Sequence, residues 1–256
     1  MAIFQKPFGS NQPKQDDVGT GGLEYISERH VACVFLLDTS GSMSANDAIG
    51  KLNEGLREFK TQTMTDTTFD EHTKACIDVA LISFGPDVVL HSNTGEAIRR
   101  GQQFDMASAF VPVSSMNPPV LSANGGTPMG DAIDWALDII GQQKARYNEY
   151  GTPYYRPWVF CITDGEPNDN YQAAAQRLRQ MENDTKVLGY CVGVDNFNRN
   201  VMANIFNTER IFELTNLDFP GLFKFVSSSL TTVRNSDPNA GNQVDVPAPS
   251  TLKIAF

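Results

Sequence analysis

The chain has 256 residues, of which 41% are hydrophobic, and its 20 Lys and Arg against 30 Asp and Glu give a formal net charge of −10. The apolar share is large enough for a core, so the composition excludes a wholly disordered chain. The acidic balance argues against a general binder of nucleic acids or anionic membranes, because attraction to phosphate needs a basic face.

Apolar runs of strand length alternate with stretches of helical spacing. Residues 31–37 form a continuous apolar run, typical of a strand buried on both faces. Helical spacing follows over 45–59, and a strand pattern over 76–84. Residues 87–91 predict a further strand, and the gap before it is too short for a parallel crossover, so these two strands are expected to form an antiparallel hairpin.

The alternation continues after a long irregular stretch, 92–126. Helices are expected over 129–140, 174–181, 201–206 and 220–230, and strands over 158–162, 187–194 and 211–214. This order predicts an α/β fold: a three-layer, doubly wound, mostly parallel sheet with one antiparallel edge strand. Ligands of such sheets bind at the carboxyl ends of the strands, so function is sought in the loops at that edge.

The two ends of the chain differ from this central region. Residues 1–27 are expected to form an irregular arm and 235–256 a flexible tail, which leaves 28–234 as a single domain. No stretch approaches the roughly 20 apolar residues that span a bilayer, and the first residues do not resemble a secretory signal. We therefore expect a cytoplasmic protein. The cysteines, which are interpreted as buried reduced thiols, are Cys33, Cys76, Cys161 and Cys191.

An acidic residue closes the first expected strand, and two hydroxyls follow it. Asp38, Ser40 and Ser42 stand at alternate positions, and Gly41 lets the backbone turn tightly enough for their oxygens to converge. Hard divalent cations take carboxylate and hydroxyl oxygens of this kind. The alternative interpretation of Asp38 is a cap for the helix that follows.

Two further loops carry oxygen atoms to the same expected edge. Asp164 follows the strand over 158–162 in the segment Thr-Asp-Gly, and Thr127 precedes a helix in the segment Gly-Gly-Thr-Pro. Thr127 alone is interpreted equally well as a helix cap. Asp131, in the first turn of that helix, is interpreted as a solvated residue, with orientation of the site as the alternative. Because all three loops are expected at one edge, a common cation site is favoured over separate caps.

This combination resembles the metal-ion-dependent adhesion site of the von Willebrand factor type A (vWA) domain, over roughly residues 30–234. Within that family, LLDTSGSM, GGTPMGDAI and TDGEPND are most similar to the TerY-type proteins of bacterial tellurite-resistance and stress clusters. The resemblance implies a metal site that begins with one cluster in the first loop and is completed from the other two. Its expected ligands are Asp38, Ser40, Ser42, Thr127 and Asp164.

The charge of such a site suits the binding of a partner protein. Two carboxylates only just neutralise a divalent ion, and Mg²⁺ takes six oxygens and normally keeps some waters. An Asp or Glu of another protein could replace one water. We therefore expect an interaction module without enzymatic activity that binds Mg²⁺, Mn²⁺ or Ca²⁺ and a protein partner, but neither nucleic acid nor a membrane. By resemblance to TerY-like proteins, the expected partners are a kinase and a protein phosphatase in stress or phage-defence gene clusters.

The chief alternative is a metal-dependent phosphatase or other hydrolase. An Asp at the end of the first strand resembles the haloacid-dehalogenase-type phosphatases, but these need a second Asp two residues later, where this chain has Ser40. Glu166 is the one plausible general base beside the ion, and it is interpreted as a solvated loop residue. His30 precedes its strand and is therefore expected at the opposite edge of the sheet.

A purely structural use of the motif is the third alternative. Asp195, Asn196 and Asn198 resemble calcium ligands, but the glycine and closing Glu of an EF-hand are missing, so turn and cap roles are favoured. If the protein is an interaction module, the long stretch 92–126 is the best candidate for partner specificity, because long loops near a site commonly carry it.

Overall fold

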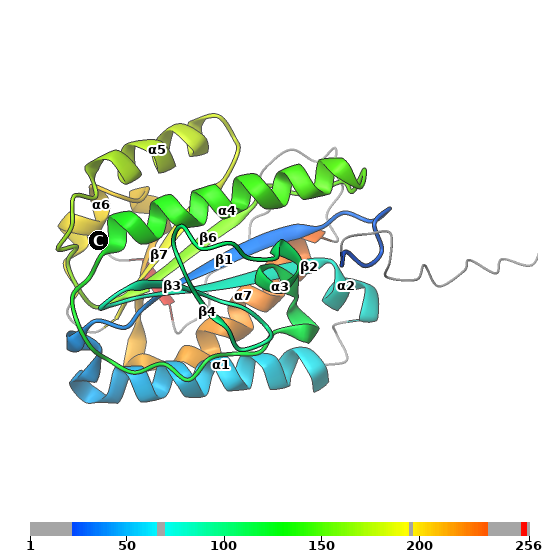
Figure 1. Ribbon diagram of the computed structural model, residues 1–256. Helices are drawn as coiled ribbons and strands as arrows, with labels where there is room; N and C mark the ends of the chain where they lie inside the picture. Colours follow the sequence, from blue (N-terminus) through cyan, green and yellow to red (C-terminus); the bar gives the residue numbers. More distant parts are fainter. Residues whose placement is uncertain (1–21, 66–69, 195–196, 235–251, 255–256) are drawn as a thin grey trace, which may run out of the picture.

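The computed structural model describes residues 22–65, 70–194, 197–234 and 252–254, in which a mixed sheet lies between two layers of helices (Figure 1). The strands are β1 (Val31–Asp38), β2 (Ile77–Phe84), β3 (Val88–His91), β4 (Ala97–Arg99), β5 (Val111–Pro112), β6 (Trp158–Thr163), β7 (Leu188–Val194), β8 (Ile211–Leu214) and β9 (Leu252–Ile254). The helices are α1 (Ala48–Thr65), α2 (Glu71–Ala75), α3 (Met106–Ala109), α4 (Met129–Glu149), α5 (Gln172–Asn183), α6 (Arg199–Ala203) and α7 (Phe219–Arg234).

The sheet order β4-β3-β2-β1-β6-β7-β8-β9 confirms the predicted α/β fold class. Strands β1, β2, β6, β7 and β8 are parallel, and β2 and β3 form the predicted antiparallel hairpin. The predicted number of antiparallel strands, one, was too low, because β4, β5 and β9 also pair antiparallel with their neighbours. Strands β4 and β5 lie in the stretch that was expected to be irregular. Each has three residues or fewer, too few to produce a periodic pattern.

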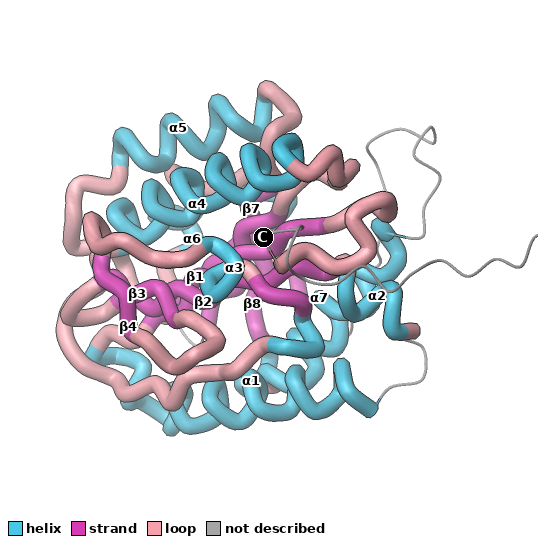
Figure 2. Tube along the Cα trace, turned by 45° about the vertical axis from the view of Figure 1, so that its right-hand side comes forward, coloured by secondary structure: helices cyan, strands magenta, loops and turns pink. Residues whose placement is uncertain are grey.

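Helices cover both faces of the sheet: α1 and α7 lie on one face, and α4, α5 and α6 on the other (Figures 1 and 2). Strand β1 runs through the middle and is buried along its whole length. Val34 and Leu36 pack into the core beneath α4, whereas Phe35 and Leu37 pack against α1 and α7. This two-sided burial explains why the strand is a continuous apolar run rather than an alternating one.

The strand order of the sheet reverses between β1 and β6. From β1 the chain crosses to β2 on one side, whereas β6, β7 and β8 extend the sheet on the other side. This reversal of strand order is where open α/β sheets bind their ligands. Leu37 of β1 is in register with Ile162 of β6. Asp38 and Thr163, the residues that follow these two, therefore leave the sheet side by side.

The ends of the chain are described only in part. Leu252–Ile254, expected to be a loose end, instead forms β9 against β8. The remaining expected arm and tail lie largely outside the described residues, so the domain boundaries stay a prediction. Leu23, at the inner end of the arm, is 2% exposed and packs into the core beneath α4.

The cysteines agree with the sequence interpretation: each of the four is buried and none of them forms a disulfide. Among the described residues, no helix is both long and apolar enough to cross a membrane.

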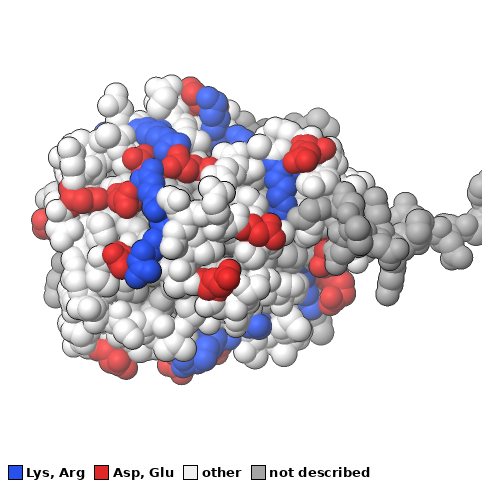
Figure 3. Space-filling view, in the orientation of Figure 1, with Lys and Arg blue, Asp and Glu red and all other residues white. Residues whose placement is uncertain are grey.

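Basic side chains on the face shown in Figure 3 lie beside acidic ones instead of forming a large basic patch. Arg99 pairs with Asp87, and Arg100 with Asp131 and Asp138. The electrostatic attraction of this face for polyanions is therefore weakened by neighbouring carboxylates.

Candidate metal centre

Asp38, the last residue of β1, is a fully buried carboxylate. Its Oδ1 accepts a hydrogen bond from the Ser40 N–H at 2.7 Å, and its Oδ2 accepts one from the Thr163 hydroxyl at 2.5 Å. Among the ion pairs of the described residues, none joins Asp38 to a Lys, Arg or His. Hydrogen bonds therefore stabilise this charge, but no cationic side chain of the described residues offsets it.

The pKa of Asp38 reflects this imbalance. Burial raises the pKa to about 6, and the negative charge of Asp164 acts in the same direction, although the hydrogen bonds from Ser40 and Thr163 oppose the rise. A bound divalent cation would reverse the effect, because it is the largest charge in such a site and favours the ionised carboxylate. The buried carboxylate is thus in an environment that suits a cation.

The hydroxyls of the first loop link this carboxylate to the loop after β6. Ser40 Oγ lies 3.0 Å from Ser42 Oγ, and the Ser42 hydroxyl donates to Asp164 Oδ1 at 2.7 Å. These separations are those of ordinary hydrogen bonds. The hydroxyls of Ser40 and Ser42 thus join the first loop to Asp164 in a chain of oxygen atoms.

Thr127 brings its hydroxyl to the same place from just before α4. A Cβ atom built on Gly165 would lie 3.2 Å from Thr127 Oγ1 and 3.6 Å from both Asp38 Oδ2 and Ser42 Oγ. Three oxygens from two segments, the loop after β1 and the segment before α4, thus face one point beside Gly165, which has no side chain to fill the space. The structure therefore brings together all the predicted ligands, which are Asp38, Ser40, Ser42, Thr127 and Asp164.

Backbone contacts hold the first loop beside the segment before Thr127. The Gly41 N–H donates to the carbonyl of Gly125 at 3.1 Å, and the Asn124 N–H donates to the carbonyl of Thr39 at 2.7 Å. Gly125 has a φ of +75°, and a Cβ there would lie 2.5 Å from the Pro86 nitrogen. Only glycine fits this position, which explains one of the two glycines in the Gly-Gly-Thr-Pro segment.

Neither cap interpretation describes the observed helix starts. After Asp38 the chain forms a 3-10 turn over Gly41–Asp47, and α1 begins only at Ala48, later than predicted. At α4, the cap position is Pro128, and no side chain at that position bonds the helix. The hydroxyl of Thr127 and the carboxylate of Asp38 are thus not used as caps of these helices.

Three polar residues near this site were not among the predicted ligands. Thr163 binds Asp38 as described, and its Oγ1 also accepts from the Gly165 N–H at 3.1 Å. Asn168 and Asp169 bind the start of α4. All three belong to the segment TDGEPND, so their types were visible in the sequence, but their partners lie about 40 residues away or more and no local pattern identified them.

The residues considered for general-base catalysis have other partners. Glu166 is exposed, and its Oε1 accepts from Asn198 Nδ2 at 2.6 Å. Asn198 caps α6 through its Oδ1, which accepts from the N–H groups of Asn200 and Val201, as the cap interpretation expected. His30 lies at the opposite edge of the sheet, also as expected, and its Nδ1 lies 2.7 Å from Asp78 Oδ2.

The donor set is composed of oxygen atoms. Within the described part of the chain, no group of three or more His, Cys, Asp and Glu side chains is arranged to hold a metal. The centre instead combines the carboxylates of Asp38 and Asp164 with three hydroxyls. Such a set suits hard cations, which prefer oxygen ligands, better than metals that favour imidazole or thiolate.

The fold and this cluster of oxygen atoms at the carboxyl edge of the sheet point to one class of α/β domains. The family model of the von Willebrand factor type A domain matches residues 33–225, and the chain therefore belongs to this family.

Three solved structures share the fold. The vWF domain of the type V pili tip protein Mfa5 from Porphyromonas gingivalis has a TM-score of 0.53 and 10% identity, over 82% of this chain and 98% of that one. The pilus adhesin SpaC from Lactobacillus rhamnosus GG has a TM-score of 0.54 and 13% identity, over 80% and 31%. The proximal thread matrix protein 1 of the mussel byssus, with a zinc-occupied MIDAS motif, has a TM-score of 0.52 and 16% identity, over 81% of this chain and 46% of that one.

This chain thus spans less than half of the adhesin SpaC and of the byssus protein. At these identities the likeness shows the fold alone. A comparison with curated protein sequences gave no match.

Proposed function

We propose that this protein is a metal-dependent protein-interaction module, in which a divalent cation at the carboxyl edge of the sheet takes a carboxylate from a partner protein. The observation that carries the proposal is the Asp38 carboxylate, which is fully buried, has no cationic side chain among its described partners, and faces the same point beside Gly165 as the oxygens of Ser42 and Thr127. Membership of the vWA family supports the same function.

The side chains divide into a buried and an exposed part of the site. Asp38, Ser40 and Thr127 are buried and would hold the ion from the protein side. Ser42 is exposed and Asp164 is half-buried, so the site opens to solvent beside them. When bound, the ion would supply an electrophilic centre that remains only just neutralised by two carboxylates. A carboxylate of a partner could approach from this open side.

The oxygen donors favour Mg²⁺, with Mn²⁺ or Ca²⁺ as substitutes. The proposed ligands are Asp38, Ser40, Ser42, Thr127 and Asp164. The mussel byssus protein with its zinc-occupied MIDAS motif supports a divalent ion in this fold.

The proposed biological setting rests on the sequence. The segments LLDTSGSM, GGTPMGDAI and TDGEPND resemble TerY-type proteins, which suggests a bacterial tellurite-resistance, stress or phage-defence system with a kinase or protein phosphatase as partner. Four buried cysteines that form no disulfide suit a reducing cytoplasm.

We further propose that the protein is not an enzyme. Glu166, the one candidate base beside the proposed metal site, is exposed and accepts a hydrogen bond from Asn198. Ser40 stands at the position where the phosphatase alternative needs an Asp. Phosphatase and nucleotide-hydrolysis assays with Mg²⁺ test this point. Turnover that is lost in Glu166→Gln would contradict it.

The decisive experiment measures metal and partner binding in the same variants. Mn²⁺ binding by electron paramagnetic resonance, with competition by Mg²⁺, is expected for the wild type and not for Asp38→Ala. Asp134→Ala removes a half-buried carboxylate of α4 that pairs with Arg177, so it serves as the matched control and should bind like the wild type. Capture of the gene-cluster kinase or phosphatase should require Mg²⁺ and fail in EDTA. Equal capture in EDTA would refute the proposal.

A further inference from the structure

Asn168, in the loop after β6, holds the segment that carries Thr127. Its Oδ1 accepts from the Thr127 N–H at 3.0 Å, and its own N–H donates to the Thr127 carbonyl at 3.1 Å. Both backbone groups of Thr127 are therefore bound by one residue. Because Asn168 is only four positions after Asp164, these bonds tie together the segments of two proposed metal ligands.

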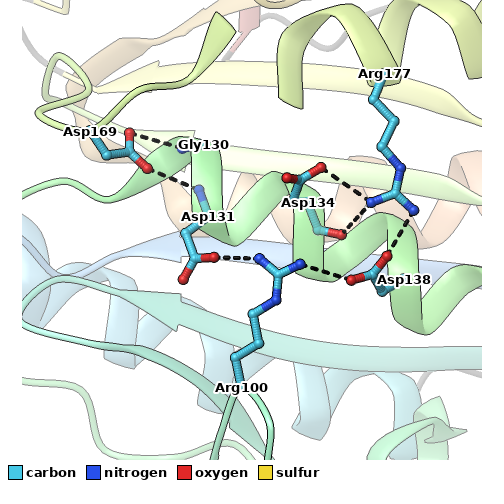
Figure 4. A network of polar contacts seen from close by, with 7 residues as sticks. All are labelled: Arg100, Gly130, Asp131, Asp134, Asp138, Asp169 and Arg177. Carbon is cyan, nitrogen blue, oxygen red and sulfur yellow. Dashed lines mark hydrogen bonds and ion pairs between the residues drawn. The ribbon is translucent and has the colours of Figure 1, made fainter. Parts of the chain in front are cut away.

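The next residue, Asp169, binds the start of α4 (Figure 4). Its Oδ1 accepts from the Gly130 N–H at 3.1 Å, and its Oδ2 from the Asp131 N–H at 2.9 Å. N–H groups in the first turn of a helix have no partner within the helix, and negative charge is favourable there. Since no side chain at Pro128 caps α4, a carboxylate from another segment supplies the missing cap.

Two glycines allow these segments to approach closely. A Cβ atom on Gly126 would lie 2.0 Å from Asn168 Nδ2, and one on Gly130 would lie 2.6 Å from the Cα of Tyr171. A side chain at Gly130 would push the loop backbone away from α4, and one at Gly126 would displace the side chain of Asn168. The contact between the loop and the helix start is thus specified on both sides.

Ion pairs attach the same structures farther along α4 (Figure 4). Arg177 of α5 bonds Asp134 at 3.1 Å and Asp138 at 2.8 Å. Arg100, from the turn after β4, bonds Asp138 at 2.9 Å and also bonds Asp131. These side chains are about one-third to one-half exposed, so they contribute less than the backbone contacts of the loop.

We propose that Asn168 and Asp169, here called the Asn168/Asp169 clasp, are positioning residues of the metal site. The clasp fixes Thr127 relative to Asp164, so that ligands from two separate segments are already in place when a cation arrives. Ordering a loop costs conformational entropy, and outer partners of metal ligands affect affinity because they remove that cost. This inference rests on the proposed function, because it assumes that the site binds a cation.

The test compares Mn²⁺ affinity with the stability of the metal-free protein. In Asp169→Ala and Asn168→Ala, affinity is expected to fall about tenfold or more, the usual range for outer partners of metal ligands. Asp169→Asn keeps one acceptor oxygen and should fall between Asp169→Ala and the wild type. Arg177→Gln is the matched control: it removes the ion pairs between α4 and α5 without touching Thr127, and should leave Mn²⁺ affinity unchanged.

The melting temperature of each metal-free variant reports its stability. Because all affinities are measured well below that temperature, where the variants are folded, a loss of affinity reports positioning of the ligands and not unfolding. A clasp variant that melts earlier but binds Mn²⁺ like the wild type overturns the inference, and so does an equal loss of affinity in Arg177→Gln. If the wild type binds Mn²⁺ and Asp38→Ala does not, an unaffected clasp variant refutes the clasp alone. If the wild type binds no Mn²⁺, the proposed function fails and the inference fails with it.

Discussion

The two edges of the sheet each bury a carboxylate, but they treat its charge differently. At the amino edge, Asp78 of β2 is 1% exposed and is bound by His30 at 2.7 Å and by the hydroxyl of Tyr147. At the carboxyl edge, Asp38 of β1 is fully buried and is bound by hydroxyl and backbone donors. A potentially cationic partner is therefore part of the fold at one edge and missing from the described contacts at the other.

The pKa values of the neighbouring groups show what this difference means. Burial lowers the pKa of His30, but attraction and hydrogen bonding to Asp78 outweigh that effect, so the pKa lies well above its ordinary value. Burial raises the pKa of Asp38 to about 6. The amino edge thus stabilises its own ion pair, whereas the carboxyl edge leaves a buried charge that an external cation would stabilise. We infer that a carboxylate compensated within the chain serves the fold, and an uncompensated one serves binding.

The largest expected effect is on stability at the amino edge. His30→Ala leaves Asp78 buried without a cation, and removing one partner of a buried pair typically costs about 3–5 kcal/mol in the free energy of unfolding. Chemical denaturation at pH 7 measures the loss. His30→Gln keeps a donor but no charge, and should recover part of it. A loss no greater than that of an exposed ion pair would contradict the assigned role of His30.

A substitution at the carboxyl edge should have the opposite sign. Asp38→Asn removes a buried charge whose pKa is raised from 3.8 to about 6, so the metal-free protein is expected to gain up to about 3 kcal/mol in the free energy of unfolding at pH 7. Addition of Mg²⁺ should raise the melting temperature of the wild type only, since a ligand stabilises the state that binds it. A less stable variant that still responds to Mg²⁺ would contradict this comparison.

The two edges should also respond to pH in different windows. The folded-state pKa of Asp38 is raised from 3.8 to about 6. Its favourable contribution to the free energy of unfolding is therefore complete below pH 3.8 and is lost as the pH rises to about 6. The folded-state pKa of His30 is raised from 6.5, so its contribution is present below 6.5 and is lost at alkaline pH. Each slope is at most about 1.4 kcal/mol per pH unit.

Unfolding measured from pH 4 to 10 tests this separation. Asp38→Asn should remove the pH dependence of the free energy of unfolding only at acid pH, and His30→Ala should remove it only at alkaline pH. Identical pH profiles for the two variants would contradict it.

The smallest effect is expected at an exposed pair near the amino edge. His72 and Glu28 are in contact, with 53% and 33% of their side chains exposed. Exposed ion pairs contribute about 0–1 kcal/mol, so His72→Ala should change the free energy of unfolding by less than 1 kcal/mol. A loss as large as that of His30→Ala would show that burial does not distinguish the two histidines.

Much of the fold could be predicted from local patterns. The run over 31–37 indicated a strand buried on both faces, and the short gap after 84 indicated a hairpin; both are observed. The short strands β4 and β5 were missed because two or three residues carry no period. β9 was missed because its pairing depends on the free edge of β8, which its own residues do not reveal.

The sequence by itself determined which residue types stand at the carboxyl ends of the strands, because strand periodicity and motif spacing are local properties. It therefore identified Asp38, Thr127 and Asp164 before any contact was known. Only the tertiary structure decided that Thr163 binds Asp38 and that Asn168 holds Thr127, since these partners are 125 and 41 positions apart. It also decided that His30 compensates Asp78 while Asp38 has no cationic partner in the part of the chain that the structure describes, because burial and charge pairing arise only when distant segments pack together.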